Sequence, residues 1–282
     1  MHSIFSYWSF DYITTAFIVL LCFAYLYIIN FKIKKQSAYF FAGIILLIIC
    51  IDSPLHFLGE NYLFSAHMLS HTLIILIVAP LLIAGIPTEN KCKNSFISFS
   101  KKISKAPFIC WLIGVSIMWF WHIPSIFNNM FMINMQSSSH TMNLLSYTHM
   151  FSLLLAGMLF CLPVINPYST YKLSSLKSVL YLTSACVFCS LLGLLITFAP
   201  VGTYTHYINI NDAYNLLPTI RNSWNISTAT DQQAGGLIMW VPCCFIYLTA
   251  SMILLIKWFD EKKIIVDNNS NQHYELGLKP NG

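Results

Sequence analysis

Residues 66–87 read AHMLSHTLIILIVAPLLIAGIP and contain no Asp, Glu, Lys or Arg. A transmembrane helix needs about 20 predominantly apolar residues, so this stretch is long enough to cross a bilayer. Six further apolar stretches are also long enough: 12–31, 38–58, 107–123, 140–165, 178–200 and 235–257. We therefore predict an all-α polytopic integral membrane protein, with a seven-transmembrane-helix bundle over residues 1–259 and a short polar tail over 260–282.

The composition supports a membrane protein independently. Hydrophobic residues make up 57% of the 282-residue chain and charged residues 9%, which excludes an ordinary water-soluble globular protein. The 15 Lys and Arg residues are spread over separate segments instead of forming one basic stripe. We therefore predict contact with the lipid bilayer and no nucleic-acid site.

The distribution of positive charge predicts the orientation of the bundle. Cytoplasmic loops of membrane proteins collect Lys and Arg, most strongly in short loops. With seven crossings, 14 of the 15 Lys and Arg fall on one side, and only Arg221 falls on the other. The amino terminus is therefore predicted outside, and the carboxyl terminus with the 260–282 tail in the cytoplasm.

The nine cysteines do not predict a disulfide framework, because none falls in a predicted outer loop. Most buried thiols act as small apolar packing residues. Cys186 and Cys189 form a CxxC within the sixth predicted span, and Cys243 and Cys244 are adjacent in the seventh. Packing is the default role for all four, and metal ligation is the alternative.

Histidine is distributed in the opposite way to Lys and Arg. Eight of the nine histidines fall in predicted outer segments or outer helix halves, and His273 is the exception. His67 and His71 are four residues apart, which places them on one helix face about 6 Å apart along the axis. Two imidazoles at this spacing can ligate one metal ion. The alternative is that histidine fills a polar niche from which Lys and Arg are excluded.

Other histidines end or begin the neighbouring spans. His122 ends the fourth span, with Met118 one turn deeper on the same face. His140 opens the fifth span, and His149 lies further in but half a turn round the helix axis. We therefore do not expect His140 and His149 to share a ligand sphere.

Asp52 is the only acidic residue well inside a predicted span. A carboxylate there is costly unless it faces the bundle interior and has a partner. It lies one turn deeper than His56, so it can orient a metal-bound histidine. Equally, it can hydrogen-bond backbone groups freed by Pro54.

Thioether and imidazole ligands together suit Cu(I). Met130, Met132, Met135 and Met142 lie in the outer loop and helix start around His140. Met68, Met118 and Met239 are expected to face inward, and adaptable packing is the alternative role for these methionines. Asp231 and Met239 share one face of the seventh span with Gly235, although an acidic first turn also complements the helix dipole. We expect a copper site, with haem ligated by histidines of facing helices as the alternative.

Four strings carry a family resemblance. They are Asp52-Ser-Pro-Leu, Ser65-Ala-His67-Met-Leu-Ser-His71, Trp121-His122-Ile-Pro124 and Asp231-Gln-Gln-Ala-Gly235-Gly-Leu-Ile-Met-Trp240-Val-Pro242. Over about residues 38–259 the chain resembles the CtaG family of multi-spanning cytochrome c oxidase assembly factors. Cys243 and Cys244 depart from the family, which has small residues there.

The resemblance implies a non-catalytic factor in a bacterial inner or plasma membrane that helps to build the copper centre of a haem-copper oxidase. Its expected partners are cytochrome c oxidase subunits and an extracytoplasmic copper donor. The ligand positions carried over are His67, His71, His122, His149 and Asp231, with His56 and His140 matching less closely. Asp52, Met118 and Met239 are expected around them.

Two other functions are weighed against this one. A metal permease usually has charged or broken-helix features near the bilayer midplane, and the midplane here is almost uncharged. No nucleophile with a base and an orienting group can be assembled from the sequence, so we do not predict an enzyme.

Overall fold

The computed structural model describes residues 7–8, 10–89, 93–136 and 144–277, and within these ranges the chain is all-α with no β-strand. The predicted all-α class is therefore confirmed. The α-helices are α1 (Tyr12–Ile28), α2 (Lys35–Asp52), α3 (Pro54–Asn61), α4 (Phe64–Leu73), α5 (Ala79–Ala84), α6 (Lys93–Ser104), α7 (Pro107–His122), α8 (Pro124–Gln136), α9 (Leu144–Ile165), α10 (Ser175–Phe198) and α11 (Thr228–Gly277). Short π or 3-10 turns are η2 (Ile74–Val78), η3 (Ser169–Tyr171), η4 (Thr205–Tyr207) and η5 (Thr219–Ser223).

In the described part of the chain, five helical segments are long and apolar enough to cross a membrane. They are Lys35–Asn61, Phe64–Ala84, Leu144–Ile165, Ser175–Phe198 and Thr228–Lys263. A sixth is possible if α6 and α7, which meet at an 85° bend, count as one span. Helix α1 is apolar but has 17 residues. The protein is thus a multi-pass membrane protein with five to six candidate spans.

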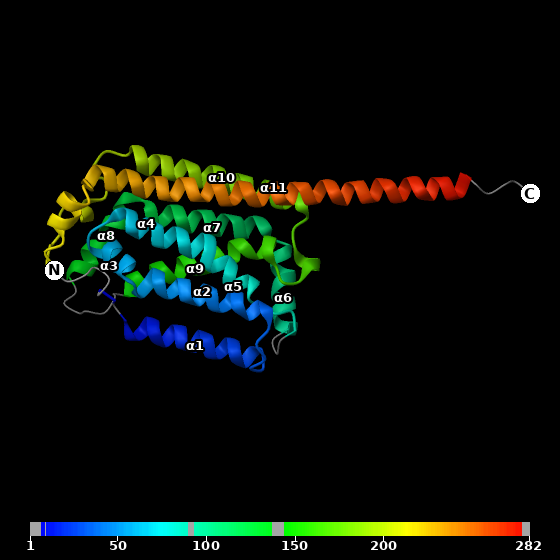
Figure 1. The fold of residues 1–282 in the computed structure, drawn as a ribbon, viewed down its shortest axis with the longest axis horizontal. Coiled ribbons are helices and arrows are strands. Elements are labelled where there is room, and N and C mark those ends of the chain that lie inside the picture. The colour runs from blue at the N-terminus through cyan, green and yellow to red at the C-terminus, as the bar shows by residue number, and fades with distance from the viewer. Residues whose placement is uncertain (1–6, 9, 90–92, 137–143, 278–282) are drawn as a thin grey trace, which may run out of the picture.

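The long helices lie side by side along the long axis of the molecule, and α11 extends beyond the bundle (Figure 1). Helix α11 packs on α10 and α4, while α9 packs on α7 and α5. The α1–α2 connection, α6 and the α9–α10 connection lie at one end, and the α3–α4 connection, α8 and the α10–α11 connection lie at the other (Figure 1). The lysine-rich segments therefore share one end of the bundle, and the histidine-bearing segments share the opposite end.

Two prolines interrupt the early spans. Pro54 is the first residue of α3, and Ser53 before it is extended, with its hydroxyl accepting a bond from Leu55 N. Pro80 lies just after the π turn Ile74–Val78. A proline in a helix removes one backbone hydrogen bond, which accounts for an irregular turn before it. Short π segments inside helices frequently mark functional sites, and this one begins one turn after His71.

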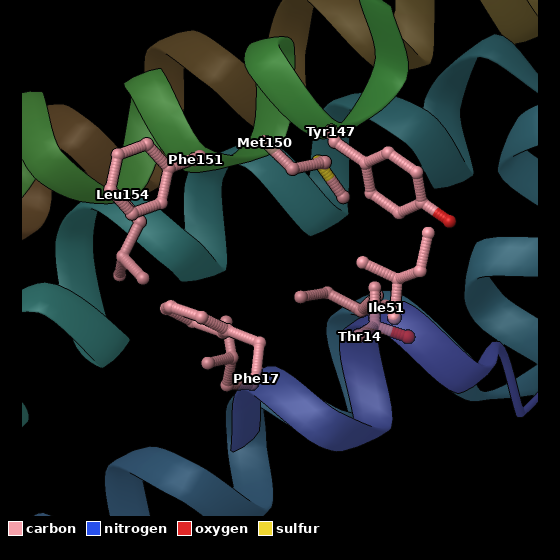
Figure 2. Close-up of a pocket in the computed structure, with 9 residues that line it drawn as sticks. Thr14, Phe17, Ile51, Tyr147, Met150, Phe151 and Leu154 are labelled. Carbon is pink, nitrogen blue, oxygen red and sulfur yellow. The ribbon is translucent and has the colours of Figure 1, made fainter. Parts of the chain in front are cut away.

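An apolar cavity of about 250 Å³ lies between α1 and α9 (Figure 2). Phe17 of α1 faces Phe151 of α9 across it, with ring centroids 6.0 Å apart. At one edge the Tyr147 hydroxyl donates a 2.7 Å hydrogen bond to Asp11, the residue that caps α1. None of the residues lining this cavity is a histidine, so it is separate from the predicted site.

Candidate metal centre

Helix α4 presents His67 and His71 on one face, and both side chains are buried. Their ring centroids are 4.2 Å apart, as the four-residue spacing predicts. The helix is positioned by its neighbours, since a Cβ on Gly59 of α3 would lie only 2.9 Å from the His67 backbone nitrogen. This glycine lets α3 fold back closely over the first turn of α4.

His149 of α9 completes a group of three. Its ring centroid lies 4.6 Å from that of His71 and 5.7 Å from that of His67. One donor atom from each of these three histidines lies within 4.8 Å of the others, and all three side chains are buried. We call His67, His71 and His149 the histidine triad.

His122, at the end of α7, lies beside the triad. Its ring centroid is 5.5 Å from that of His71. Its Nδ1 is hydrogen-bonded to the Met118 carbonyl oxygen, which can only accept, so Nδ1 donates and Nε2 keeps its lone pair. The Tyr204 hydroxyl donates to the His122 carbonyl and holds this helix end in place.

Several triad nitrogens lack any hydrogen-bond partner among the described residues. They are both ring nitrogens of His71 and Nε2 of His67, and Nε2 of His122 shares this state. Buried polar atoms in folded proteins are nearly always paired, so an unpaired cluster requires an explanation. A metal ion that accepts imidazole lone pairs would satisfy one such nitrogen of His67 and one of His71.

A carboxylate orients the first histidine. Glu60 Oε1 lies 3.3 Å from His67 Nδ1, and the Glu60 side chain is 24% exposed against 3% for His67. Metal-binding histidines usually donate their second N–H to such a group, which fixes the tautomer and raises ligand basicity. With Nδ1 engaged by Glu60, Nε2 is the nitrogen of His67 that is available to a metal.

Aromatic residues enclose the triad. The Phe127 and Phe131 rings each lie 5.4 Å from the His67 ring, and the Trp121 ring lies 4.6 Å from the His149 ring. Trp121 Nε1 donates to Ser152 Oγ, which in turn donates to the His149 carbonyl. This short chain of hydrogen bonds fixes α7 against α9 at the level of the triad.

Asp231, predicted as a ligand, lies at the amino terminus of α4. Its two carboxylate oxygens accept hydrogen bonds from Phe64 N at 2.8 Å and Ser65 N at 3.0 Å, and the Ser65 hydroxyl also donates to it. Leu63, the residue before α4, supplies no side-chain cap of its own. Asp231 of α11 therefore caps α4 from another helix. The capped residue Ser65 lies two residues before His67, the first histidine of the triad.

The remaining predicted residues have varied positions. The Asp52 carboxylate accepts a hydrogen bond from Thr14 of α1, and buried His56 lies near enough to Glu60 and His67 to interact electrostatically. Met118 and Met239 are buried in the main apolar core. His140 lies outside the described residues.

Two neighbours of the triad were not predicted from the sequence, namely Glu60 and His206. His206, in the α10–α11 connection, bonds through Nε2 to the Glu60 carbonyl oxygen at 2.8 Å and stacks on Phe131. Burial lowers the pKa of His206, against the opposing effect of that hydrogen bond. The sequence held one signal for Glu60. The predicted spans 38–58 and 66–87 are joined by a short connection, so a residue in that connection must lie near the start of the second of them.

The donor set fits a transition metal. Three buried imidazoles converge, a carboxylate supports one of them, and aromatic rings surround them. Imidazole suits Zn, Cu, Fe and Ni, whereas Mg and Ca prefer oxygen ligands. The geometry therefore favours a soft or borderline metal over a hard one.

Comparison with known proteins adds the family. The family model described as cytochrome c oxidase caa3 assembly factor (Caa3_CtaG) matches residues 30–261 of this chain. The same comparisons found no matching curated protein and no matching solved structure. The match covers all of the helices from α2 to α10 and the apolar part of α11. The chain therefore belongs to the family of cytochrome c oxidase caa3 assembly factors.

Proposed function

We propose that this chain is a non-catalytic assembly factor that holds Cu(I) at the histidine triad and passes it to a cytochrome c oxidase subunit. The observation that carries the proposal is the convergence of His67, His71 and His149, whose donor atoms lie within 4.8 Å of one another in a buried site. The family supplies the oxidase as the destination. His122 is placed to replace one triad ligand during transfer.

The geometry favours a copper ion over haem. Two histidines that ligate haem axially must lie on opposite faces of the macrocycle, so their rings cannot touch. The three rings of the triad do touch, with centroids 4.2 to 5.7 Å apart. Cu(I) needs only two or three ligands and accepts imidazole nitrogen. A single ion therefore fits between these rings without displacing a helix.

Transfer requires an accessible side of the site. A cavity of about 170 Å³ is lined by His122 and Tyr204 and lies between α7 and α10. We propose that the oxidase subunit docks at this histidine-bearing end of the bundle, where an extracytoplasmic copper donor also delivers. Asp231, His56 and Asp52 then act as positioning residues in this account, with Asp231 holding α4.

We further propose seven crossings of a bacterial plasma membrane, with α1 and α7 as the short ones and the amino terminus outside. The positive charge at the α1–α2, α6 and α9–α10 end supports a cytoplasmic location for that end. Fusions of a reporter that is active only outside the cytoplasm test this. Activity after Asn209 and none after Lys172 is expected, and the reverse pattern would invert the topology.

The test of function is metal content. The full-length protein, purified in detergent under reducing conditions, is expected to retain copper, and a His67→Ala, His71→Ala double variant is expected to lose the part held by the triad. His273→Ala, a histidine change far along the sequence from the triad, serves as the matched control. A histidine-dependent Soret band in the visible spectrum would instead establish haem, and copper unchanged in the double variant would remove the triad from the account.

A further inference from the structure

Four cysteines meet where α10 packs against α11. Cys186 and Cys189 lie on α10, and Cys243 and Cys244 lie on α11. Cys186 Sγ is 3.6 Å from Cys244 Sγ, and the buried Cys189 and Cys243 side chains lie close enough to interact electrostatically. The CxxC and the adjacent pair of the sequence are thus brought together as two cross-helix thiol pairs.

Glycines make this close approach possible. A Cβ on Gly193 of α10 would lie 2.7 Å from the Trp240 Cβ, and a Cβ on Gly236 of α11 would lie 2.7 Å from the Thr197 backbone nitrogen. Small residues at such positions let transmembrane helices approach closely. The thiols therefore face one another across a tight interface between α10 and α11. Packing of small side chains alone would not require four thiols at this place.

The spacing of the four cysteine sulfurs favours some thiolate-binding metals over others. In the described part of the chain, the histidine triad is the one group of at least three His, Cys, Asp or Glu side chains whose donor atoms all lie within 4.8 Å of one another. The four sulfurs therefore do not form one compact tetrahedral sphere of the kind that Zn or an iron–sulfur cluster uses. Two separate pairs suit a metal that accepts two sulfur ligands, which is the habit of Cu(I).

Charge also favours a monovalent ion. A cation in the hydrocarbon interior is costly, and neutral imidazoles leave the charge of Cu(I) uncompensated. When a thiol pair binds Cu(I), loss of one thiol proton to solvent gives a neutral complex of one thiolate, one thiol and the ion, with no change of oxidation state. Ser190 donates its hydroxyl proton to the Cys186 carbonyl at 2.7 Å, so its oxygen, 3.0 Å from Cys244 Sγ, is placed to accept the Cys244 thiol proton.

The thiols adjoin the histidine-bearing end through one residue. Met118 of α7 and Cys189 line the same small cavity of about 10 Å³, with Gly114 and Gly157 in its wall. The carbonyl of Met118 accepts the hydrogen bond of His122. Met118 thus bonds to His122 through its backbone and lines the same cavity as Cys189 of the inner thiol pair.

From these observations we propose that Cys186, Cys189, Cys243 and Cys244 form a second Cu(I) site, built from two cross-helix thiol pairs and separate from the histidine triad. The site depends on sulfur chemistry alone and stands whether or not the triad holds metal. Its partner is the cuprous ion, which sulfur ligands select over harder metals.

The test is an anaerobic titration of the full-length protein in detergent with Cu(I), against a chromophoric Cu(I) chelator. Copper per chain and the near-ultraviolet thiolate-to-Cu(I) absorption are read together. The unaltered protein is expected to show this absorption, and the His67→Ala, His71→Ala variant is expected to keep it. A variant with all four cysteines changed to Ser is expected to lose it while keeping the copper bound by histidine.

The matched control is Cys50→Ser with Cys110→Ser, two buried thiols on α2 and α7. This variant is expected to behave as the unaltered protein. Absorption that survives the fourfold change, or that never appears in the unaltered protein, would overturn the second site. Copper per chain that is unchanged in the His67→Ala, His71→Ala variant, with the absorption intact, would instead contradict the proposed function alone.

A second measurement needs no variant. Prior addition of Cu(I) is expected to protect Cys186 and Cys244 from a small membrane-permeant thiol reagent, as read by mass spectrometry of each peptide. The reaction of Cys110 is expected to stay unchanged. Equal modification of Cys186 with and without Cu(I) would also overturn the proposal.

Discussion

The Glu60 carboxylate lies 3.3 Å from Nδ1 of His67, across the two-residue connection between α3 and α4. This contact joins two residues whose separation is set by a tight turn, in which Tyr62 N and Leu63 N both donate to the Leu58 carbonyl. The carboxylate engages Nδ1 of His67 and leaves Nε2 without a hydrogen-bond partner, in a ring that packs beside those of His71 and His149. Orientation of one ligand is therefore built into the local fold of the α3–α4 hairpin.

The first prediction concerns Glu60. Glu60→Gln removes the negative charge but keeps the size of the side chain, so the fold should be retained while the basicity of His67 falls. Loss of such a supporting carboxylate typically weakens metal affinity roughly 10- to 100-fold. Competition with a Cu(I) chelator measures this. Glu89→Gln, whose carboxylate pairs with Lys93 at the opposite end of the bundle, is the control and should bind as the unaltered protein does.

The second prediction separates the two candidates for the third ligand. His149 has a donor atom within the 4.8 Å group, whereas His122 lies outside it and is tied to Met118. His149→Ala should therefore lose the same share of copper retained after desalting as the His67→Ala, His71→Ala variant does, and His122→Ala should leave the amount per chain unchanged while altering its rate of release. Copper lost in His122→Ala but kept in His149→Ala would place the site on His122 instead.

Apolar length and helical spacing were sufficient to predict much of this structure. The predicted spans 66–87, 140–165 and 178–200 correspond to Phe64–Ala84, Leu144–Ile165 and Ser175–Phe198. The pairing of His67 with His71 follows from a four-residue spacing on one helix. Such features depend on one segment at a time, so no knowledge of packing was needed.

Contacts between segments were harder to predict. The second span was expected to end at residue 58, which left Glu60 in a loop, whereas the structure extends α3 to Asn61 and turns it back over His67. The basic stretch before Pro107 was read as a connection but forms α6, at 85° to α7. The donors to the Asp231 carboxylate, the Phe64 and Ser65 amides of α4, are more than 160 residues away in sequence, so the capping of α4 by Asp231 does not follow from the seventh span alone.

The third prediction tests that role of Asp231. Asp231→Ala leaves the first amides of α4 without a partner, and loss of an N-cap costs about 0.5–2 kcal/mol of stability. The midpoint of thermal unfolding in detergent should fall, while the copper content of the folded protein at low temperature should persist. Asp260→Ala, an exposed acidic residue on α11, should change neither quantity. Copper lost without a change in unfolding would instead make Asp231 a direct ligand.

The fourth prediction concerns Gly235, one turn after Asp231 on the same face of α11. A Cβ there would lie 2.4 Å from Phe64 Cδ1 and 3.2 Å from Met68 Cγ, on the helix that carries the triad. Replacing glycine by alanine within a helix ordinarily stabilises it by up to about 1 kcal/mol, but overpacking costs roughly 1–3 kcal/mol. Gly235→Ala should therefore lower the free energy of unfolding and, by displacing α4 from α9, weaken copper binding. Gln233→Ala, an exposed position two residues earlier, should be neutral or stabilising. A stabilised Gly235→Ala protein with normal copper affinity would show that the interface between α4 and α11 accommodates the added methyl group, and would contradict this prediction.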